Sequence, residues 1–459
     1  MQPPLDPTGL DPAAKDALIL ALMERIDALA AQNAALAKRI EDLEAKLAAP
    51  PKTPDNSSTP PSRGRKPSPG AGSPKPKGKP HKGSARALHP SPTRTVEARA
   101  GSCPRCAASL ADAPQTVVDR YDRIELPEVL LEVTRVEVWG GSCPCCRKRF
   151  RAIPPAGLQP GSPWGPKLRA ALVLLRMRHA VSIERLAELA RDLFGLSISE
   201  GAIVGILKDA VKPARETVAR VEAELLAGSC LASDETGVRI GKATGWLWIF
   251  HHGPSAVFRI ALSRGKDVVE GLLGEHRPDF WLSDRFGAQM GWARKGQQVC
   301  LAHLIRDAQY AIDAGDAVFA PGLRTLFEDA CAVGRRRDGL KDATLAGHAA
   351  KLEKRLDALL KLAPSCAEGK KLRKAILSCR QHLWVFLENR EVEPTNNGSE
   401  RGLRPAATFR KVTNCFRTAW GAALYADIRA VLETARRRSI GALRAIQLAL
   451  RGELLPAEG

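Results

Sequence analysis

The sequence lacks any long apolar run. No stretch approaches the roughly 18 consecutive apolar residues that a membrane-spanning helix needs. Residues 1–11 also lack the basic start and the apolar core of a signal peptide. These two absences argue against an integral membrane protein and a secreted protein, so we expect a cytoplasmic one. The 11 cysteines are then expected to be thiols or metal ligands rather than disulfides.

Acidic residues are in deficit. The chain has 50 of them against 70 lysines and arginines, which gives a formal charge of +20. A positive surplus of this size predicts a polyanionic partner. Nucleic acid is the leading candidate, ahead of a membrane surface or an acidic protein. The hydrophobic fraction of 44% over 459 residues is sufficient for roughly two to four domains with buried cores.

Residues 16–47 carry an unbroken heptad repeat. Ile or Asn at one apolar position with Leu at the other is typical of parallel dimers, and a buried Asn such as Asn33 sets the register. We therefore predict a dimerising coiled coil over residues 1–48. The alternative is a single amphipathic helix that packs on the main body. The two phases are Ile19, Ile26, Asn33, Ile40 and Leu47, and Leu22, Leu29, Leu36 and Leu43.

Residues 49–100 are rich in Pro, Gly and Ser, and their charged side chains are mostly basic. Such a segment buries too little apolar surface to offset the entropy of ordering it. We predict a disordered basic linker. It is either a solvated spacer or a segment that also contacts DNA phosphates without sequence preference.

Two C-x-x-C motifs lie within residues 101–158, and the stretch 116–139 between them alternates apolar and polar residues. The alternation predicts a β-hairpin. Two such knuckles on a small β unit are typical of a closed, structural zinc site. The alternative is four unrelated reduced thiols, and Cys145 is either a bystander or a substitute ligand. The predicted Zn²⁺ ligands of this zinc ribbon are Cys103, Cys106, Cys143 and Cys146.

In residues 159–227 the apolar residues recur with the period of an α-helix. One amphipathic helix is expected over residues 182–194, with a break at Gly195. The capping-box spacing from Ser197 to Glu200 then starts a second helix. Two short helices around a glycine turn resemble a helix-turn-helix, which makes this domain a candidate for reading DNA. Helical pairs of this kind are common, so a purely structural role stays open.

From residue 228 the pattern changes to strands. Three strands, a helix, a fourth strand, a fifth strand and a helix follow in the order of an RNase H-like α/β fold. In that fold the first acid lies on the first strand and the second follows the fourth, which are the places of Asp234 and Asp284. The expected strands cover 230–240, 245–251, 256–262 and 280–283 and begin again at 298, with a helix over 266–273.

A third acid normally comes from a late helix, and Glu400 lies at the start of one. Phosphodiester transfer uses two hard cations roughly 3.5–4 Å apart, and Mg²⁺ is held by a few carboxylates plus substrate phosphates. Asp234, Asp284 and Glu400 are therefore the predicted catalytic acids and the ligands of Mg²⁺ or Mn²⁺. Each acid alone is an ordinary strand, turn or helix-start carboxylate, so the prediction depends on their order and their places in the fold.

At these residues the chain resembles the transposases of the insertion-sequence 66 family, over nearly its whole length. The resemblance implies a DDE transposase that cuts the ends of an insertion sequence and joins them to target DNA. It also implies an oligomer, and small accessory proteins of the same element as partners. The motifs that carry it are Asn56-Ser-Ser-Thr-Pro-Pro-Ser62, Asp234-Glu-Thr236, Cys300-Leu-Ala-His303 and Asn397-Gly-Ser-Glu400-Arg401-Gly-Leu-Arg404-Pro405.

Carried over residue by residue, Asp234, Asp284 and Glu400 match the family's acids. Cys300 and His303 match a C-x-x-H element, whose role is either catalytic support or local core packing. The chain departs from the family directly after Asp284, where Arg, Phe and Gly stand in place of a small-aromatic pair. This departure makes Asp279 the fallback for the second acid.

Basic residues close to Glu400 are predicted to hold DNA phosphates near the metals. The alternative is a solvated helix face. Residues 317–391, which separate the second acid from the third, are mostly helical and basic, so they are interpreted as an insertion in the catalytic core. The predicted DNA-binding residues are Arg401, Arg404, Arg410, Lys411 and Arg417.

The predicted fold is therefore multidomain α/β, built on an RNase H-like core. Two other functions stay open, a catalytically inactive DNA-binding protein derived from a transposase and a simple RNase H-like nuclease. We expect the protein in the cytoplasm, associated with the nucleoid. The predicted order is a coiled coil (1–48), a linker (49–100), a zinc ribbon (101–158), a helical DNA-binding domain (159–227), the first part of the core (228–316), the insertion (317–391), the last part of the core (392–440) and a tail (441–459).

Overall fold

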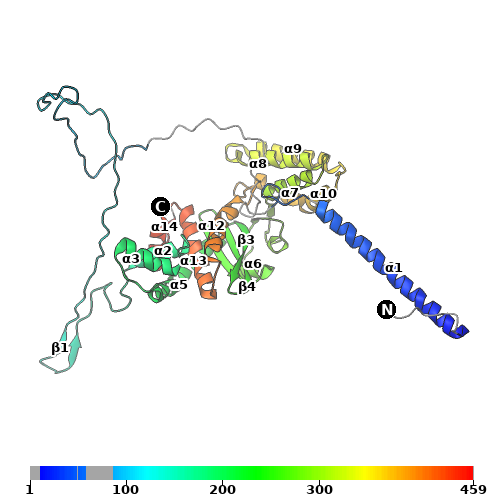
Figure 1. Cartoon of the computed structure of the whole chain (residues 1–459), viewed down its shortest axis with the longest axis horizontal. Helices are drawn as coiled ribbons and strands as arrows, with labels where there is room; N and C mark the ends of the chain where they lie inside the picture. The colour runs from blue at the N-terminus through cyan, green and yellow to red at the C-terminus, as the bar shows by residue number, and fades with distance from the viewer. Residues whose placement is uncertain (1–10, 49, 58–85, 458–459) are drawn as a thin grey trace. The chain divides into compact units, whose positions relative to one another are not determined.

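The computed structural model describes residues 11–48, 50–57 and 86–457 (Figure 1). The chain forms two compact units. The first consists of residues 1–65, 164–182 and 205–459, and the second of residues 66–163 and 183–204. The predicted acids all belong to the first unit, and the predicted zinc ligands all belong to the second.

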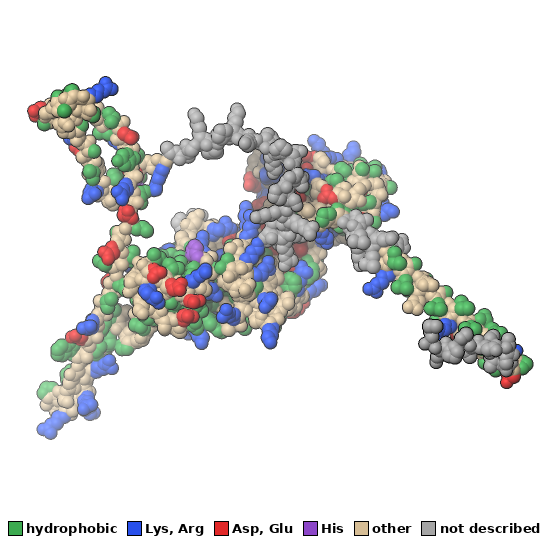
Figure 2. All heavy atoms as spheres, in the orientation of Figure 1, with side chains coloured by type: hydrophobic (Ala, Val, Ile, Leu, Met, Phe, Trp, Pro, Cys, Tyr) green, Lys and Arg blue, Asp and Glu red, His purple; other side chains and the backbone are tan. Residues whose placement is uncertain are grey.

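The predicted coiled coil is one helix, α1 (Pro12–Ala48). Its apolar heptad side chains that the structure describes are about half exposed (Figure 2), including Ile26 at 63% and Leu29 at 52%. An apolar stripe open to water on a single helix favours a second helix as its partner. Dimerisation through α1 stays a prediction.

Asn56 ties the start of the predicted linker to the first unit. The side chain is buried, and its oxygen accepts a hydrogen bond from the backbone N–H of Thr53 at 2.7 Å. Its amide donates to the Asp313 carboxylate at 2.8 Å, at the end of α7 (Leu301–Asp313). Residues 53–57 are therefore a bound turn rather than a solvated spacer. Most of the predicted linker, residues 58–85, lies outside the described residues.

The first unit contains a five-stranded sheet with the order β5-β4-β3-β6-β7. The first three strands are antiparallel, and β6 and β7 run parallel to β3. The parallel pairing of β3 with β6 makes the first and fourth predicted strands, which carry Asp234 and precede Asp284, neighbours in the sheet. The strands are β3 (Cys230–Ile240), β4 (Ala243–His252), β5 (Ser255–Ala261), β6 (Phe280–Ser283) and β7 (Gly296–Val299).

Large apolar side chains hold this sheet in place. Trp248, Phe250, Phe258 and Trp281 are fully buried, and each ring of this size contributes strongly to the burial of apolar surface. Helices α12 (Asn397–Thr413) and α13 (Ala419–Arg437) pack on the sheet, α12 against β3 and β4 and α13 against β5 (Figure 1). Helix α6 (Lys266–Leu273) precedes β6.

The structure divides the predicted helical domain and the predicted tail differently from the sequence analysis. Helices α2 (Pro166–Met177) and α5 (Val211–Leu226) belong to the first unit and pack with α13 and α14 (Ala442–Leu450). Residues 441–459 therefore contain a packed helix, because Ala445, Ile446 and Ala449 bury an apolar face.

Helices also fill the stretch that was predicted as an insertion. Their apolar side chains, including Phe327 and Phe386, form a core that continues to Val299 of β7. None of the helices in the described part of the chain is long and apolar enough to cross a membrane. The helices are α8 (Ala320–Gly334), α9 (Asp342–Leu360), α10 (Ala367–Cys379) and the short α11 (Val385–Glu388).

In the second unit the predicted hairpin over residues 116–139 is wrong, since that stretch has no strand. Its alternating apolar side chains have no surface to pack on, and Val118 and Val133 are 95% and 85% exposed. The only strands in the described part of the unit are β1 (Gly140–Ser142) and β2 (Arg149–Arg151), which pair around the second knuckle.

The predicted helix pair is present as α3 (Ile183–Phe194) and α4 (Glu200–Asp209). Between them Gly195 has a φ of +61°, a conformation that glycine adopts without strain. The hydroxyl of Ser199, rather than that of Ser197, accepts a backbone N–H in the first turn of α4, from Ala202 at 3.2 Å. The capping residue therefore lies two positions later than the sequence spacing indicated.

Candidate active site

The register of the sheet places the first two predicted acids, Asp234 and Asp284, at the same position along two neighbouring chains. The parallel pairing of β3 with β6 ends at Ala232 and Leu282. Asp234 and Asp284 each follow two residues later on adjacent chains, Asp234 still within β3 and Asp284 directly after β6. Neighbouring strands lie about 4.8 Å apart, so the two carboxylates extend from adjacent backbones.

The carboxyl group of Asp234 is surrounded by protein atoms, although part of the residue is accessible to solvent. Burial raises the pKa of Asp234 well above its ordinary value, and the charges of Glu235, Asp284 and Glu400 raise it further. One Asp234 oxygen accepts the backbone N–H of Glu235 at 2.9 Å. The group thus lies in a field of like charges that a bound cation would relieve.

Asp284 opens a tight turn. Its Oδ1 accepts the backbone N–H of Phe286 at 2.8 Å, which leaves the second carboxylate oxygen available. The fallback residue, Asp279, lies at the opposite end of β6, about 16 Å away along an extended chain. It pairs with Lys295 at 2.8 Å and Arg294 at 2.7 Å, and the Lys295 ammonium holds the pKa of its carboxyl below the ordinary value. The structure thus favours Asp284 over Asp279.

Glu400 comes from the first turn of α12, and its Oε1 accepts a hydrogen bond from Arg306 of α7 at 3.0 Å. Among the described residues, only Cys230, His252 and Glu391 gather metal-ligating atoms within 4.8 Å of one another. The three acids are therefore spread more widely than a single small cation requires. This spacing is compatible with a pair of cations roughly 3.5–4 Å apart.

A buried chain of hydrogen bonds sets the start of α12. The Asn396 amide donates to the Ser233 carbonyl at 2.7 Å, directly before Asp234. Ser399 donates to Asn396 Oδ1 at 2.6 Å, and its oxygen lies 2.9 Å from Nε2 of His251. Burial holds the pKa of His251 well below its ordinary value, so the network places the proton of the neutral ring on Nε2. Glu400 is thereby tied in position to the strand that carries Asp234.

Two glycines let α12 approach the sheet. A Cβ on Gly398 would lie 2.9 Å from Cε1 of His251, and one on Gly402 would lie 2.4 Å from Cδ1 of Ile249. Real Cβ atoms essentially never come so close to other heavy atoms. The glycines of the Asn397–Pro405 motif are therefore explained by close packing against β4.

Cys300 and His303 lie beside the acids. Cys300 is fully buried, accepts the Asn396 backbone N–H on its sulfur at 3.1 Å, and has its pKa raised to about 12 by burial. This inert thiol positions α12. Burial lowers the pKa of His303, and Asp284 and Glu400 act on it in the opposite direction. Nδ1 of His303 is buried without a hydrogen-bond partner.

Sequence reasoning missed several residues of this site. Arg306 stands three positions after His303 on α7, a spacing that places both on one helix face. Both carboxylate oxygens of Glu235 have partners. One forms an ion pair with Arg264 at 2.6 Å, and the other accepts a hydrogen bond from the Gln289 amide. Arg264 in turn lies over the Trp246 and Phe286 rings. Glu235 is thus a structural carboxylate, although it stands next to Asp234.

The predicted DNA-binding residues divide into two groups. Arg401, Arg404, Lys411 and Arg417 are exposed. Arg410 is only partly exposed, and it donates to the Gly237 carbonyl of β3. Four of these side chains are therefore open to a polyanion, while Arg410 fastens the end of α12 to the sheet.

The predicted zinc ligands form two knuckles of the same local shape. In each, the first cysteine's carbonyl accepts the N–H of the residue four positions on, Ala107 or Arg147, and both residues have a φ of +58°. Backbone N–H groups lower the pKa of Cys103 and Cys143, which suits thiolate ligands. Within the described residues the two knuckles are not brought together around a common point.

Comparison with known proteins identifies the family of the chain. No curated protein shows significant similarity to the chain. The family model of the transposase IS66 family matches residues 161–424. That range contains the three acids, Cys300, His303 and the five strands of the sheet. Because the match covers more than half of the 459 residues, the chain belongs to the transposase IS66 family.

Proposed function

We propose that the chain is an active DNA transposase that cleaves the ends of an insertion sequence and joins them to target DNA by two-metal-ion phosphoryl transfer. The observation that supports the proposal is that Asp234 of β3, Asp284 after β6 and Glu400 at the start of α12 lie in one region, where the charges of Asp284 and Glu400 help to raise the pKa of Asp234. An all-oxygen donor set fits Mg²⁺ or Mn²⁺. When bound, the cations activate the attacking oxygen and stabilise the leaving one.

The reaction takes place in two displacements at phosphorus. In the first, a water oxygen bonds to phosphorus at the end of the element and the bond to the 3′ oxygen breaks. In the second, the freed 3′-hydroxyl bonds to a target phosphorus and displaces a target 3′ oxygen. Arg306 holds Glu400 before DNA arrives. If Glu400 then binds a metal ion, the Arg306 guanidinium would be released to contact a phosphate oxygen.

DNA is held by positive charge around the acids. Arg401, Arg404, Lys411 and Arg417 contact phosphates, and each contributes to a salt-sensitive affinity. Arg410 acts through the Gly237 carbonyl rather than through DNA. The α3 and α4 pair reads the element ends as a helix-turn-helix. These contacts fit a cytoplasmic protein associated with the nucleoid.

The remaining segments assemble and support the enzyme. The exposed stripe of α1 joins two copies of the chain in a parallel coiled coil, and Zn²⁺ on Cys103, Cys106, Cys143 and Cys146 gives the ribbon its fold. Small proteins of the same element are further partners. The inactive DNA-binding alternative is not favoured, because all three acids are present and each keeps at least one carboxylate oxygen that is not bonded in the protein.

The test is cleavage and joining of labelled DNA that carries the element's own ends, with Mg²⁺. Each of Asp234→Asn, Asp284→Asn and Glu400→Gln removes a metal ligand without changing the side-chain volume. We expect each to lower the rate by about 10³-fold or more, since metal stabilisation of the transition state amounts to several kcal/mol. Binding of the same DNA, measured separately, is expected to persist.

Asp279→Asn is the matched control, because it removes a carboxylate at the other end of β6. It is expected to keep activity within a few-fold of wild type. Loss of activity in this variant alone would reverse the assignment of the second acid. A wild-type protein that binds the ends but never cuts them, even with the element's other proteins, would replace the proposal with the DNA-binding alternative.

A further inference from the structure

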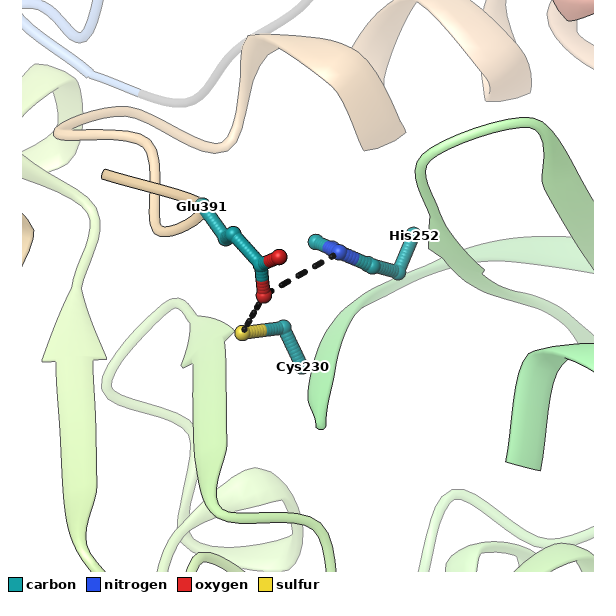
Figure 3. A group of neighbouring side chains, drawn as sticks. All are labelled: Cys230, His252 and Glu391. Carbon is teal, nitrogen blue, oxygen red and sulfur yellow. Dashed lines mark hydrogen bonds and ion pairs between the residues drawn. The ribbon is translucent and has the colours of Figure 1, made fainter. Parts of the chain in front are cut away.

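A second cluster of metal-ligating side chains lies away from the acids. Cys230 is the first residue of β3, His252 is the last residue of β4, and Glu391 lies in the loop between α11 and α12. Figure 3 shows the three side chains directed at one another from these separate segments. Their sulfur, nitrogen and oxygen atoms all lie within 4.8 Å of one another.

The distances between these atoms are close to those around a tetrahedral transition-metal ion, and none exceeds 4.8 Å. Zn–S bonds of about 2.3 Å and Zn–N and Zn–O bonds of about 2.0–2.2 Å separate the ligands of a tetrahedron by roughly 3.3–3.8 Å. In the structure Oε2 of Glu391 lies 3.3 Å from the Cys230 sulfur and 3.9 Å from Nε2 of His252. Only small side-chain rotations are needed to place all three on one ion.

The types of donor select the kind of ion. A thiolate, an imidazole and a carboxylate suit Zn²⁺ and its neighbours, whereas Mg²⁺ takes oxygen ligands. Exposure leaves a fourth position for water, because the Glu391 side chain is 57% exposed and that of His252 is 26% exposed. Cys230, at 3% exposed, forms the buried floor of the site.

We propose that Cys230, His252 and Glu391 bind one Zn²⁺-class ion, with water as the fourth ligand. The alternative is a metal-free cluster in which Ser229 and Cys230 both donate to Glu391. In that arrangement His252 makes only a longer ion-pair contact with Glu391, with 3.9 Å between Nε2 and Oε2. A metal ion would link the first residue of β3 and the last residue of β4 to the loop that leads into α12 and Glu400. This role rests on the proposed function, but binding of the ion does not.

The test is a Co²⁺ titration of the metal-stripped full-length protein, followed by optical absorption. The two knuckles also bind this ion, so the titration uses a Cys103→Ser/Cys143→Ser background. One equivalent per chain is expected to remain, with the visible bands of tetrahedral cobalt and a thiolate-to-cobalt charge-transfer band. Co²⁺ held by the three acids has no thiolate ligand and lacks that band.

In that background, Cys230→Ser is expected to abolish the charge-transfer band. His252→Asn and Glu391→Gln are expected to weaken Co²⁺ binding by at least 10-fold. Cys331→Ser, which removes another buried thiol in α8, is the matched control and is expected to change neither property. The partly exposed positions of His252 and Glu391 keep these two variants folded even if Cys230→Ser is not.

The proposal is overturned if no thiolate band appears in the background protein, or if His252→Asn and Glu391→Gln bind Co²⁺ as tightly as it does. These readouts do not involve DNA. A protein that binds Co²⁺ here but fails to cleave DNA supports the metal site and contradicts the transposase proposal. A protein that cleaves DNA but binds no Co²⁺ here supports the transposase proposal and contradicts the metal site.

Discussion

The first unit, which contains the five-stranded sheet, and the cysteine-knuckle region (residues 101–158) are held together by different forces. Asp234 lies on β3 and Asp284 directly follows β6, and large side chains of this sheet, such as Trp248 and Trp281, are fully buried. In the knuckle region the C-x-x-C turns are held by hydrogen bonds within each knuckle, and residues such as Leu126 are 87% exposed. Packing positions side chains before any metal arrives, whereas a segment without a core depends on the metal for its order.

The largest expected effect is the loss of a predicted zinc ligand. Cys143→Ser is expected to abolish order over residues 101–158, because zinc binding contributes on the order of 10 kcal/mol to small zinc domains. Hydrogen exchange should show full exposure there and unchanged protection in the sheet. Cys145→Ser, in the same knuckle, is the control and should leave protection intact. Protection that survives Cys143→Ser would contradict the zinc assignment.

A pair of apolar truncations compares the two regions directly. Trp281→Ala is expected to lower the free energy of unfolding by about 3–5 kcal/mol, because it empties a fully buried site. Leu126→Ala is expected to change it by less than about 0.5 kcal/mol, because that side chain is already solvated. Chemical denaturation measures both values. Equal effects would mean that the knuckle region has a core of its own.

A smaller effect is expected within the site itself. Ser399→Ala leaves Oδ1 of Asn396 and Nε2 of His251 without their buried partner, at a cost of about 1–3 kcal/mol. Because the same chain of bonds sets the start of α12, DNA cleavage should fall while DNA binding is kept. Ser378→Ala, on the exposed side of α10, is the matched control. Unchanged cleavage in Ser399→Ala would mean that the network does not position Glu400.

Local sequence patterns were sufficient to predict the strands of the sheet, whereas the assignment of the acids stays a prediction. Alternation and turn residues located β3 to β6, and the order of the strands placed Asp234 beside Asp284. The same pattern failed over residues 116–139, because alternation favours a strand only where a surface exists to bury one face. The pairing of Arg306 with Glu400 and the cluster of Cys230, His252 and Glu391 join residues far apart in the chain. No spacing rule relates such residues, so only the fold could reveal them.

The raised pKa of Asp234 has a consequence for stability. A carboxyl whose pKa is raised on folding binds its proton more tightly in the folded protein than in the unfolded chain. The free energy of unfolding therefore falls as the pH rises from the ordinary value of 3.8 through the raised one. Near neutral pH the metal-free protein therefore bears a stability cost from the buried, crowded Asp234 that it does not bear well below pH 3.8. Asp234→Asn removes this cost, and the difference disappears well below pH 3.8.

The most direct test of the carboxylate site is therefore the thermal unfolding of wild type and Asp234→Asn, with and without Mg²⁺. In Mg²⁺-free buffer at neutral pH the variant is expected to have the higher Tm. Mg²⁺ at a hundredfold excess over its Kd is expected to stabilise the folded wild type by about 2.7 kcal/mol and so to raise its Tm. The Tm of the variant is expected to stay nearly unchanged. A variant that is less stable than wild type without Mg²⁺, or that gains as much from Mg²⁺, would contradict a metal site built on Asp234, Asp284 and Glu400.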